Sequence, residues 1–118
     1  MAFGVSMAAW AAQAPAQDAA SGAATFARMC RACHALEPGK NKMGPSLAGV
    51  VGRRAGTVEG YEYSQALKES GVVWTVQTLA PYLADPRSFL PGNKMTFVGL
   101  KDEARIRDLI AHLEENAR

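Results

Sequence analysis

The residues best able to do chemistry in this chain form the run Cys30-Arg31-Ala32-Cys33-His34. Two thiols three positions apart, followed directly by a histidine, are the attachment pattern of a covalently bound haem: each thiol adds to a vinyl group, and the histidine binds the iron. On the last turn of a helix, residues three apart share a face, so both sulfurs would meet one edge of the ring with His34 beneath it. The run therefore predicts a haem site.

Three other kinds of site use the same two cysteines. A redox-active dithiol normally lies beside a strand–helix–strand unit, and the sequence that follows does not predict one. A closed zinc site needs four ligands, but the chain has only these two cysteines and one further histidine, His112. A structural disulfide is the third alternative. None of the three requires a histidine at position 34, so haem attachment is the preferred interpretation.

Size and charge agree with a small cofactor-bearing domain. The chain has 118 residues, enough for one domain with a limited apolar core, and a porphyrin at its centre would add apolar contacts. Its formal net charge of +2 is low, and neither a basic helix nor a groove with interleaved aromatic residues is indicated. Nucleic acid is therefore not an expected partner.

Residues 1–17 differ from the rest because they are rich in alanine and carry no charge. Small-x-small triplets such as Ala14-Pro15-Ala16 are typical of signal peptidase sites, so we expect an export signal or apolar leader at 1–17, a domain at 18–118 and a periplasmic location. No Lys or Arg precedes the apolar run, so the start could lie upstream or the leader could be unstructured. A membrane span is disfavoured because Gln13 and Pro15 break a run shorter than about twenty residues.

Two apolar stripes with helical spacing predict the outer helices of the domain. The first begins at Asp18 or Ser21 and ends in the attachment site; the second begins at Asp102 and Glu103 and packs on the first near Gly22 and Phe26. Shorter helices are predicted at about 63–68 and 75–84, the latter with a late start or a kink at Pro81. Residues 89–95 are predicted to form a loop.

The histidine needs a partner on each side. Its second ring nitrogen should donate a hydrogen bond that fixes the ring, and the carbonyl of Pro45 is our candidate acceptor. For the sixth iron ligand, the candidates are His112 and the methionines. An amphipathic-face or surface role is the more common one for His112, and two methionines belong to the presumed leader. Met29 lies beside an attachment cysteine and Met43 lies in the loop expected to brace His34. This leaves Met95, although a lone methionine more commonly fills a gap in a core.

These motifs together resemble class I c-type cytochromes, of the mitochondrial-like soluble kind found in bacteria. The likeness extends over nearly all of residues 22–113. It implies an all-α protein with a small cytochrome c fold, three to five helices wrapped around one haem c that is covalently bound through Cys30 and Cys33. The matching motifs, besides the attachment run, are Gly44-Pro45-Ser46-Leu47, Gly52-Arg53, Tyr61-Glu62-Tyr63, the Trp74 segment, Tyr82-Leu83, Asp85-Pro86 and Pro91-Gly92-Asn93-Lys94-Met95.

The resemblance implies roles for polar residues around the haem propionates. Tyr63 and Trp74 would hydrogen-bond one propionate, and Arg53 would offset its charge. Asn93 would reach the other propionate. Ordinary core packing is the alternative for the aromatic residues and a solvated loop charge the alternative for Arg53, but buried Tyr and Trp polar atoms need partners, which favours the propionate roles.

On the other side of the ring, the resemblance implies metal ligation by His34 and Met95. The Tyr82 hydroxyl would point to the Met95 sulfur, and Phe97 would cover the ring. The sequence departs from the family at Leu67, where an asparagine is common, at Pro81, and at His112, where an aromatic residue is common. An amphipathic-face or surface role is expected for His112.

A His/Met pair leaves no open position on the iron, so the resemblance implies one-electron transfer and not an enzyme. The expected partners are a membrane cytochrome bc complex and a terminal oxidase or photosynthetic reaction centre, met by a monomer with no small-molecule substrate. A peroxidase-like haem enzyme, or a haem sensor or subunit module with a labile sixth ligand, stays open as the alternative. Acidic docking surfaces would meet a basic rim, which we define as Lys40, Lys42, Arg87, Lys94 and Lys101, unless these are scattered solubilising charges.

Overall fold

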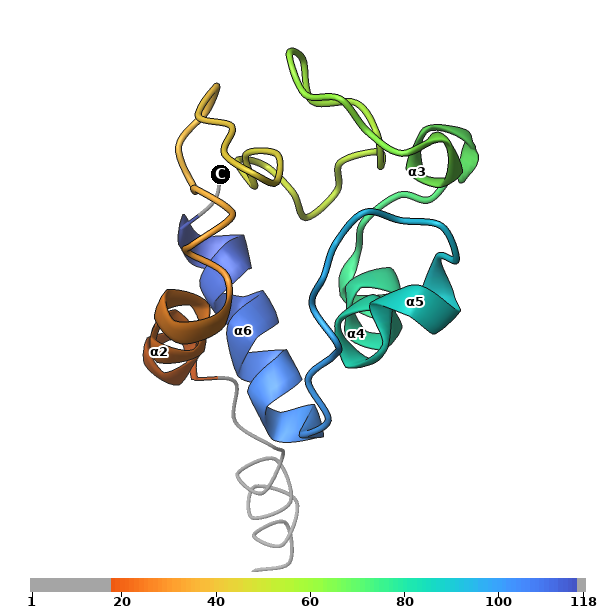
Figure 1. Ribbon diagram of the computed structural model, residues 1–118. Coiled ribbons are helices and arrows are strands. Elements are labelled where there is room, and N and C mark those ends of the chain that lie inside the picture. Colours follow the sequence, from red (N-terminus) through yellow and green to blue (C-terminus); the bar gives the residue numbers. More distant parts are fainter. Residues whose placement is uncertain (1–17, 117–118) are drawn as a thin grey trace, which may run out of the picture.

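The computed structural model describes residues 18–116, and its regular elements there are five helices. Helices α2 and α6 cross on one side of the molecule, α4 and α5 lie on the other, and long loops join them (Figure 1). Within the described residues the β-structure is limited to two isolated bridges, between His34 and Asn41 and between Arg54 and Val73. The predicted all-α class is confirmed. The helices are α2 (Ala19–Met29), α3 (Gln65–Glu69), α4 (Val76–Ala84), α5 (Pro86–Phe89) and α6 (Glu103–Asn116).

The crossing of α2 and α6 depends on one glycine. A Cβ atom at Gly22 would lie 2.0 Å from the backbone oxygen of Asp108, so a larger residue would force the two helices apart. Asp18 caps α2 with its side chain, and its own backbone N–H donates to the Asp108 carboxylate at 2.9 Å. The predicted packing of the last helix on the first, near Gly22 and Phe26, is confirmed.

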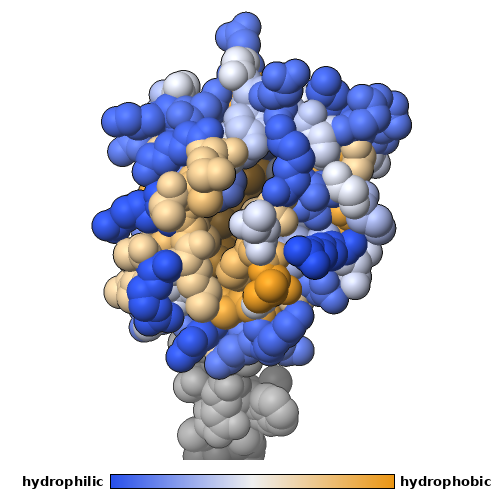
Figure 2. Space-filling view, in the orientation of Figure 1, coloured by the Kyte–Doolittle hydropathy of each residue, from blue (hydrophilic) through white to orange (hydrophobic). Residues whose placement is uncertain are grey.

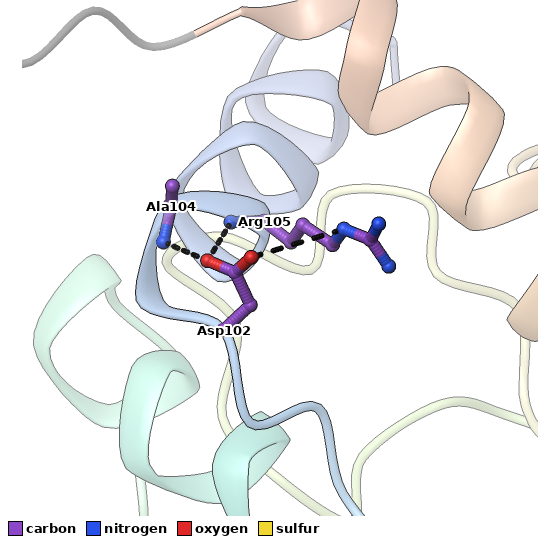
Figure 3. Close-up of polar contacts among 3 residues, drawn as sticks. All are labelled: Asp102, Ala104 and Arg105. Atoms are coloured by element: carbon purple, nitrogen blue, oxygen red, sulfur yellow. Dashed lines mark hydrogen bonds and ion pairs between the residues drawn. The ribbon is translucent and has the colours of Figure 1, made fainter.

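The Asp102 carboxylate caps the N-terminus of helix α6. Asp102 accepts hydrogen bonds from the backbone N–H groups of Ala104 and Arg105 at 2.9 and 3.4 Å (Figure 3). The Arg105 Nε atom lies 3.9 Å from the same carboxylate, but both side chains are largely exposed, so this ion pair adds little. The predicted start at Asp102 and Glu103 is therefore confirmed, and Leu109 and Ile110 are almost fully buried on the inner face.

The first helix ends earlier than predicted. Helix α2 stops at Met29 and Cys30 is its C-cap, so the attachment run continues in tight turns, in which His34 N–H donates to the Cys30 carbonyl at 2.9 Å. Met29 is 41% exposed and does not belong to the buried stripe. Similarly, α3 begins at Gln65 and not near 63, because Ser64 caps it by accepting a hydrogen bond from Leu67 N–H.

Helices α4 and α5 form a platform that the sequence only partly predicts. Thr75 and Thr78 form a capping box, so α4 begins at Val76. Of the two alternatives expected at Pro81, the late start is therefore wrong, and the kink stays a prediction. Pro81 lies inside the helix with its side chain exposed. Helix α5 was not predicted. A proline disfavours continuation of the preceding helix, α4, but it also suits the first turn of a new helix, and α5 begins at Pro86.

The core joins the two sides of the molecule. Trp74 packs against Tyr82 and Phe89, with ring centroids 4.7 and 6.3 Å apart. Figure 2 shows a hollow in one face with apolar side chains around it and hydrophilic residues further out. Among residues 18–116, no helix has the length and apolar character needed to cross a membrane. The buried cluster consists of Phe26, Val50, Ala55, Trp74, Leu79, Leu83, Leu90, Leu100, Ile106, Leu109, Ile110 and Leu113.

Candidate functional site

The His34 ring is fixed by the residue that the sequence indicated. Its Nδ1 atom lies 2.8 Å from the carbonyl oxygen of Pro45. Because a carbonyl only accepts hydrogen bonds, Nδ1 carries the proton and Nε2 keeps a lone pair. Burial is the main cause that lowers the pKa of His34, although the bond to Pro45 opposes the shift. The neutral imidazole that an iron atom needs is therefore the favoured form.

A glycine closes the other side of this ring. A Cβ atom at Gly44 would lie 2.3 Å from Cε1 of His34, so no side chain fits between the loop and the imidazole. The backbone N–H of Gly44 donates to the Cys33 carbonyl at 2.8 Å, which ties the same loop to the attachment run. The histidine is thus held by its own turn, by a carbonyl and by the close approach of Gly44.

Both attachment cysteines are partly buried, and they do not form a disulfide with each other. Burial, followed by the nearby Cys33, raises the pKa of the Cys30 thiol to about 11. A redox-active dithiol needs a thiol with a lowered pKa, so this environment counts against the dithiol alternative. Among residues 18–116, no three His, Cys, Asp or Glu side chains gather as a metal site. Haem attachment needs the two thiols near one edge of the ring, where each can add to a vinyl group.

The methionine side is held by fewer contacts. The Tyr82 hydroxyl lies 3.7 Å from the Met95 sulfur and donates toward it. Burial raises the pKa of Tyr82 to about 12, so the hydroxyl keeps its proton at neutral pH. The backbone N–H of Met95 donates to Oδ1 of Asn93 at 2.9 Å. Phe97 is half-buried and packs against the core cluster.

One buried polar atom fits the predicted propionate. Arg53 Nη1 donates to the carbonyls of Ser46 and Ala48, both at 2.9 Å, but its Nε is buried without a hydrogen-bond partner among the described residues. A buried charged N–H without an acceptor is costly, and a propionate oxygen would satisfy it. Tyr63 lies close enough to influence the pKa of Arg53 and is buried itself. Its hydroxyl accepts a bond from Val58 N–H at 3.0 Å and can still donate one.

The other predicted residues lie in two places. Trp74 is buried in the core, on the same ring stack as Tyr82. Asn93 donates both its amide hydrogens to backbone carbonyls, at Pro86 and Leu90, so its bonds here are not those of a free propionate ligand. Its propionate role stays a prediction, as do those of the residues above.

Two residues that depart from the family pattern, His112 and Leu67, both contact the interior of the domain. His112 is 8% exposed at the helix crossing, with its ring 5.5 Å from the Phe26 ring. Of the two expected roles, the surface role is therefore wrong and the role on the buried face of the helix is the one observed. The Asn116 amide donates to His112 Nδ1 at 3.1 Å. Leu67 lies in α3 and packs against the core cluster. Met43 is 80% exposed.

Sequence reasoning missed a second layer of residues that hold the loops. Asn41 accepts a bond from Ser46 N–H at 2.9 Å and so supports the Pro45 segment. Tyr61 donates to the Met43 carbonyl at 2.7 Å, and Lys94 lies over the Tyr61 ring. Asparagine beside glycine and proline is a general turn signal, but it does not say which backbone group the side chain will meet.

This site combines two thiols, a neutral histidine held in one orientation and a buried arginine N–H without an acceptor, all on a small all-helical fold. These features together define a protein that carries a covalently attached haem. The cytochrome c family model matches residues 19–117. Cytochrome c2 of Blastochloris viridis is 49% identical over 110 residues, covering 92% of this chain and 86% of that protein, and cytochrome c2 iso-2 of Magnetospirillum fulvum is 54% identical over 86 residues, covering 73% and 90%. The structure of cytochrome cH from Methylobacterium extorquens superimposes with a TM-score of 0.77 at 46% identity, covering 83% of this chain and 98% of that one.

The chain belongs to the cytochrome c family. It binds haem c covalently, and Cys30 and Cys33 supply the two thiols of the attachment motif. It is an electron carrier and not an enzyme. The buried, unpartnered Nε of Arg53 and the neutral His34 are the features of this chain that fit the group.

Proposed function

We propose that this chain is a soluble, periplasmic one-electron carrier in which His34 Nε2 and Met95 Sδ ligate the iron. The observation that carries the proposal is that the chain's own hydrogen bonds already orient both side chains, His34 through Pro45 and Met95 through Tyr82. The haem supplies an iron that exchanges one electron. The residues supply neutral ligands, and a thioether at Met95 favours the ferrous state more than a second imidazole would, so it raises the reduction potential.

The proposed partners are a membrane cytochrome bc complex as donor and a terminal oxidase or photosynthetic reaction centre as acceptor. All five residues of the basic rim have exposed side chains. Lys42, Lys94 and Lys101 each donate to a backbone carbonyl, which holds these charges on the loops without neutralising them. A positive surface of this kind would speed association with acidic docking sites and make it depend on salt.

The periplasmic location depends on residues 1–17, which lie outside the described residues. Their alanine-rich, uncharged composition supports an export signal, and removal of this segment is part of the proposal. Mass spectrometry of the exported protein tests it directly. A mature chain that begins near residue 17 would support export with cleavage, whereas an intact N-terminus would contradict it.

The ligand assignment is tested by absorption spectra of the oxidised and reduced holoprotein. We expect haem that stays with the polypeptide in acidified organic solvent and a methionine-to-iron band in the oxidised form. Met95→Ala should abolish this band and leave the haem attached. Met43→Ala is the matched control, because Met43 is 80% exposed and its variant should keep the band.

Two results would contradict the proposal. A band that survives in Met95→Ala would assign the sixth ligand elsewhere. Rapid cyanide binding by the parent protein at neutral pH would show an open or labile iron position and would favour the peroxidase-like alternative.

A further inference from the structure

The side chain of Asn93 joins three backbone groups that lie on two different segments. Its Nδ2 donates to the carbonyls of Pro86 and Leu90, at 2.9 and 2.8 Å. Its Oδ1 accepts the backbone N–H of Met95 at 2.9 Å. One amide thereby connects the end of α5 to the main chain of the proposed ligand.

The segment at the other end of these bonds is firmly placed. Asp85 caps α5 by accepting from the Ser88 backbone and side chain. Pro86 is among the most completely buried residues of the structure. Phe89 packs its ring against those of Trp74 and Tyr82, with centroids 6.3 and 6.0 Å away. Helix α5 is therefore an extension of the core, and a bond to its carbonyls is a bond to a fixed frame.

The amide has no donor to spare. An asparagine side chain carries two N–H donors, and both are used on the carbonyls of Pro86 and Leu90, the first residue and the C-cap of α5. Each of these carbonyls also accepts a backbone N–H, so the amide donors meet their second lone pairs. The family resemblance implies instead that Asn93 donates to a haem propionate. In this structure the Asn93 side chain instead bonds three backbone groups.

We propose that Asn93 is a positioning residue for the sixth iron ligand. It fixes the main chain at Met95 against α5 and so keeps the sulfur beside the Tyr82 hydroxyl. This inference rests on the proposed ligation by Met95. The methionine then has two holds. The backbone hold is an N–H···O bond to Asn93 at 2.9 Å, and the side-chain hold is the Tyr82 hydroxyl, 3.7 Å from a sulfur atom that is a weak acceptor.

The test compares Asn93→Ala, which removes all three bonds, with Asn93→Ser, whose hydroxyl can still accept from the N–H two residues ahead. External imidazole displaces a labile methionine, so loss of the methionine-to-iron band is followed as imidazole is added to the oxidised protein at neutral pH. We expect about tenfold higher apparent imidazole affinity for Asn93→Ala, as for the loss of hydrogen bonds of modest net strength, and about threefold for Asn93→Ser. Amide hydrogen exchange at Met95, measured in the reduced protein, should speed up in the same order.

Asn41→Ala is the matched control, because Asn41 accepts the Ser46 N–H in the loop on the histidine side at the same 2.9 Å. It should lower stability without changing imidazole affinity. If Asn93→Ala leaves imidazole affinity and Met95 amide exchange as in the parent but alters the titration of a haem propionate, the propionate role is right and the positioning role is wrong. If the parent protein has no methionine-to-iron band at all, the proposed ligation itself fails, which is a separate outcome.

Discussion

The two proposed iron ligands are held in different ways. His34 lies in the tight turns that follow α2, its ring is closed in by Gly44, and its Nδ1 donates to a backbone carbonyl. Met95 lies on a loop, and its main chain and its sulfur each depend on one side chain, Asn93 and Tyr82. The histidine is therefore part of the frame of the domain, whereas the methionine is attached to that frame.

The difference separates stability from ligand exchange. A substitution on the histidine side disturbs backbone packing that also carries the attachment cysteines. A substitution on the methionine side removes the contacts of one side chain and leaves α2, α6 and their crossing intact. We expect the first kind to change the free energy of unfolding and the second kind to change how readily the sixth ligand is displaced.

The largest expected effect comes from Gly44→Ala. The new Cβ would lie 2.3 Å from His34 Cε1, and the ring cannot move away without losing its bond to Pro45. Overpacking at such a site costs about 3 kcal/mol, so denaturant unfolding of the holoprotein should show a large loss or the holoprotein should not accumulate. Gly39→Ala is the control: it has open space around it but a φ of +75°, so it should cost only about 1 kcal/mol. Equal effects would mean that the close approach to His34 is not what matters.

A smaller effect is expected from Tyr82→Phe. The hydroxyl lies 3.7 Å from a sulfur atom, a weak acceptor, and its loss leaves the ring stack in place. Imidazole affinity should rise by about threefold or less, in keeping with the loss of one weak hydrogen bond. An increase greater than that of Asn93→Ala would reverse the order of the two holds on Met95.

The smallest expected effect is on the pH dependence of stability, through His112 at the crossing of α2 and α6. Burial is the main cause that lowers the pKa of His112, while Glu115 opposes the shift. Below the ordinary histidine pKa of about 6.5, the unfolded chain then binds more protons than the folded one, so stability rises with pH across this window and falls as the pH drops. Unfolding of the parent and of His112→Tyr, measured at pH 5 and pH 7, should show a weaker pH dependence in the variant. Imidazole affinity measured on both proteins should agree; if it differs, the helix crossing also affects the methionine side.

The features of this protein that depend on residues close together in the chain are predictable from the sequence. The attachment run is recognisable because its three side chains act on one group within one turn of chain. The two outer helices are predictable from apolar spacing, since that signal lies within each element itself. Pro45 is a predictable acceptor for His34, because a metal-bound histidine normally donates its second ring N–H to a carbonyl or carboxylate.

Other features depended on where distant segments meet. Helix α5 was missed because Pro86 can end a helix or begin one, and packing of Phe89 against Trp74 and Tyr82 decides between them. The burial of His112 follows from the approach of α2 and α6 at Gly22.

The bonds of Asn93 show the same division at the site itself. The sequence by itself determined that an asparagine precedes the proposed ligand by two residues, and that its amide would need partners. Only the tertiary structure decided that those partners are the carbonyls of Pro86 and Leu90, each of which also accepts a backbone N–H. The physical reason is that a buried hydrogen-bond donor needs an acceptor within reach, and the packing of the whole chain decides which carbonyl oxygens lie there.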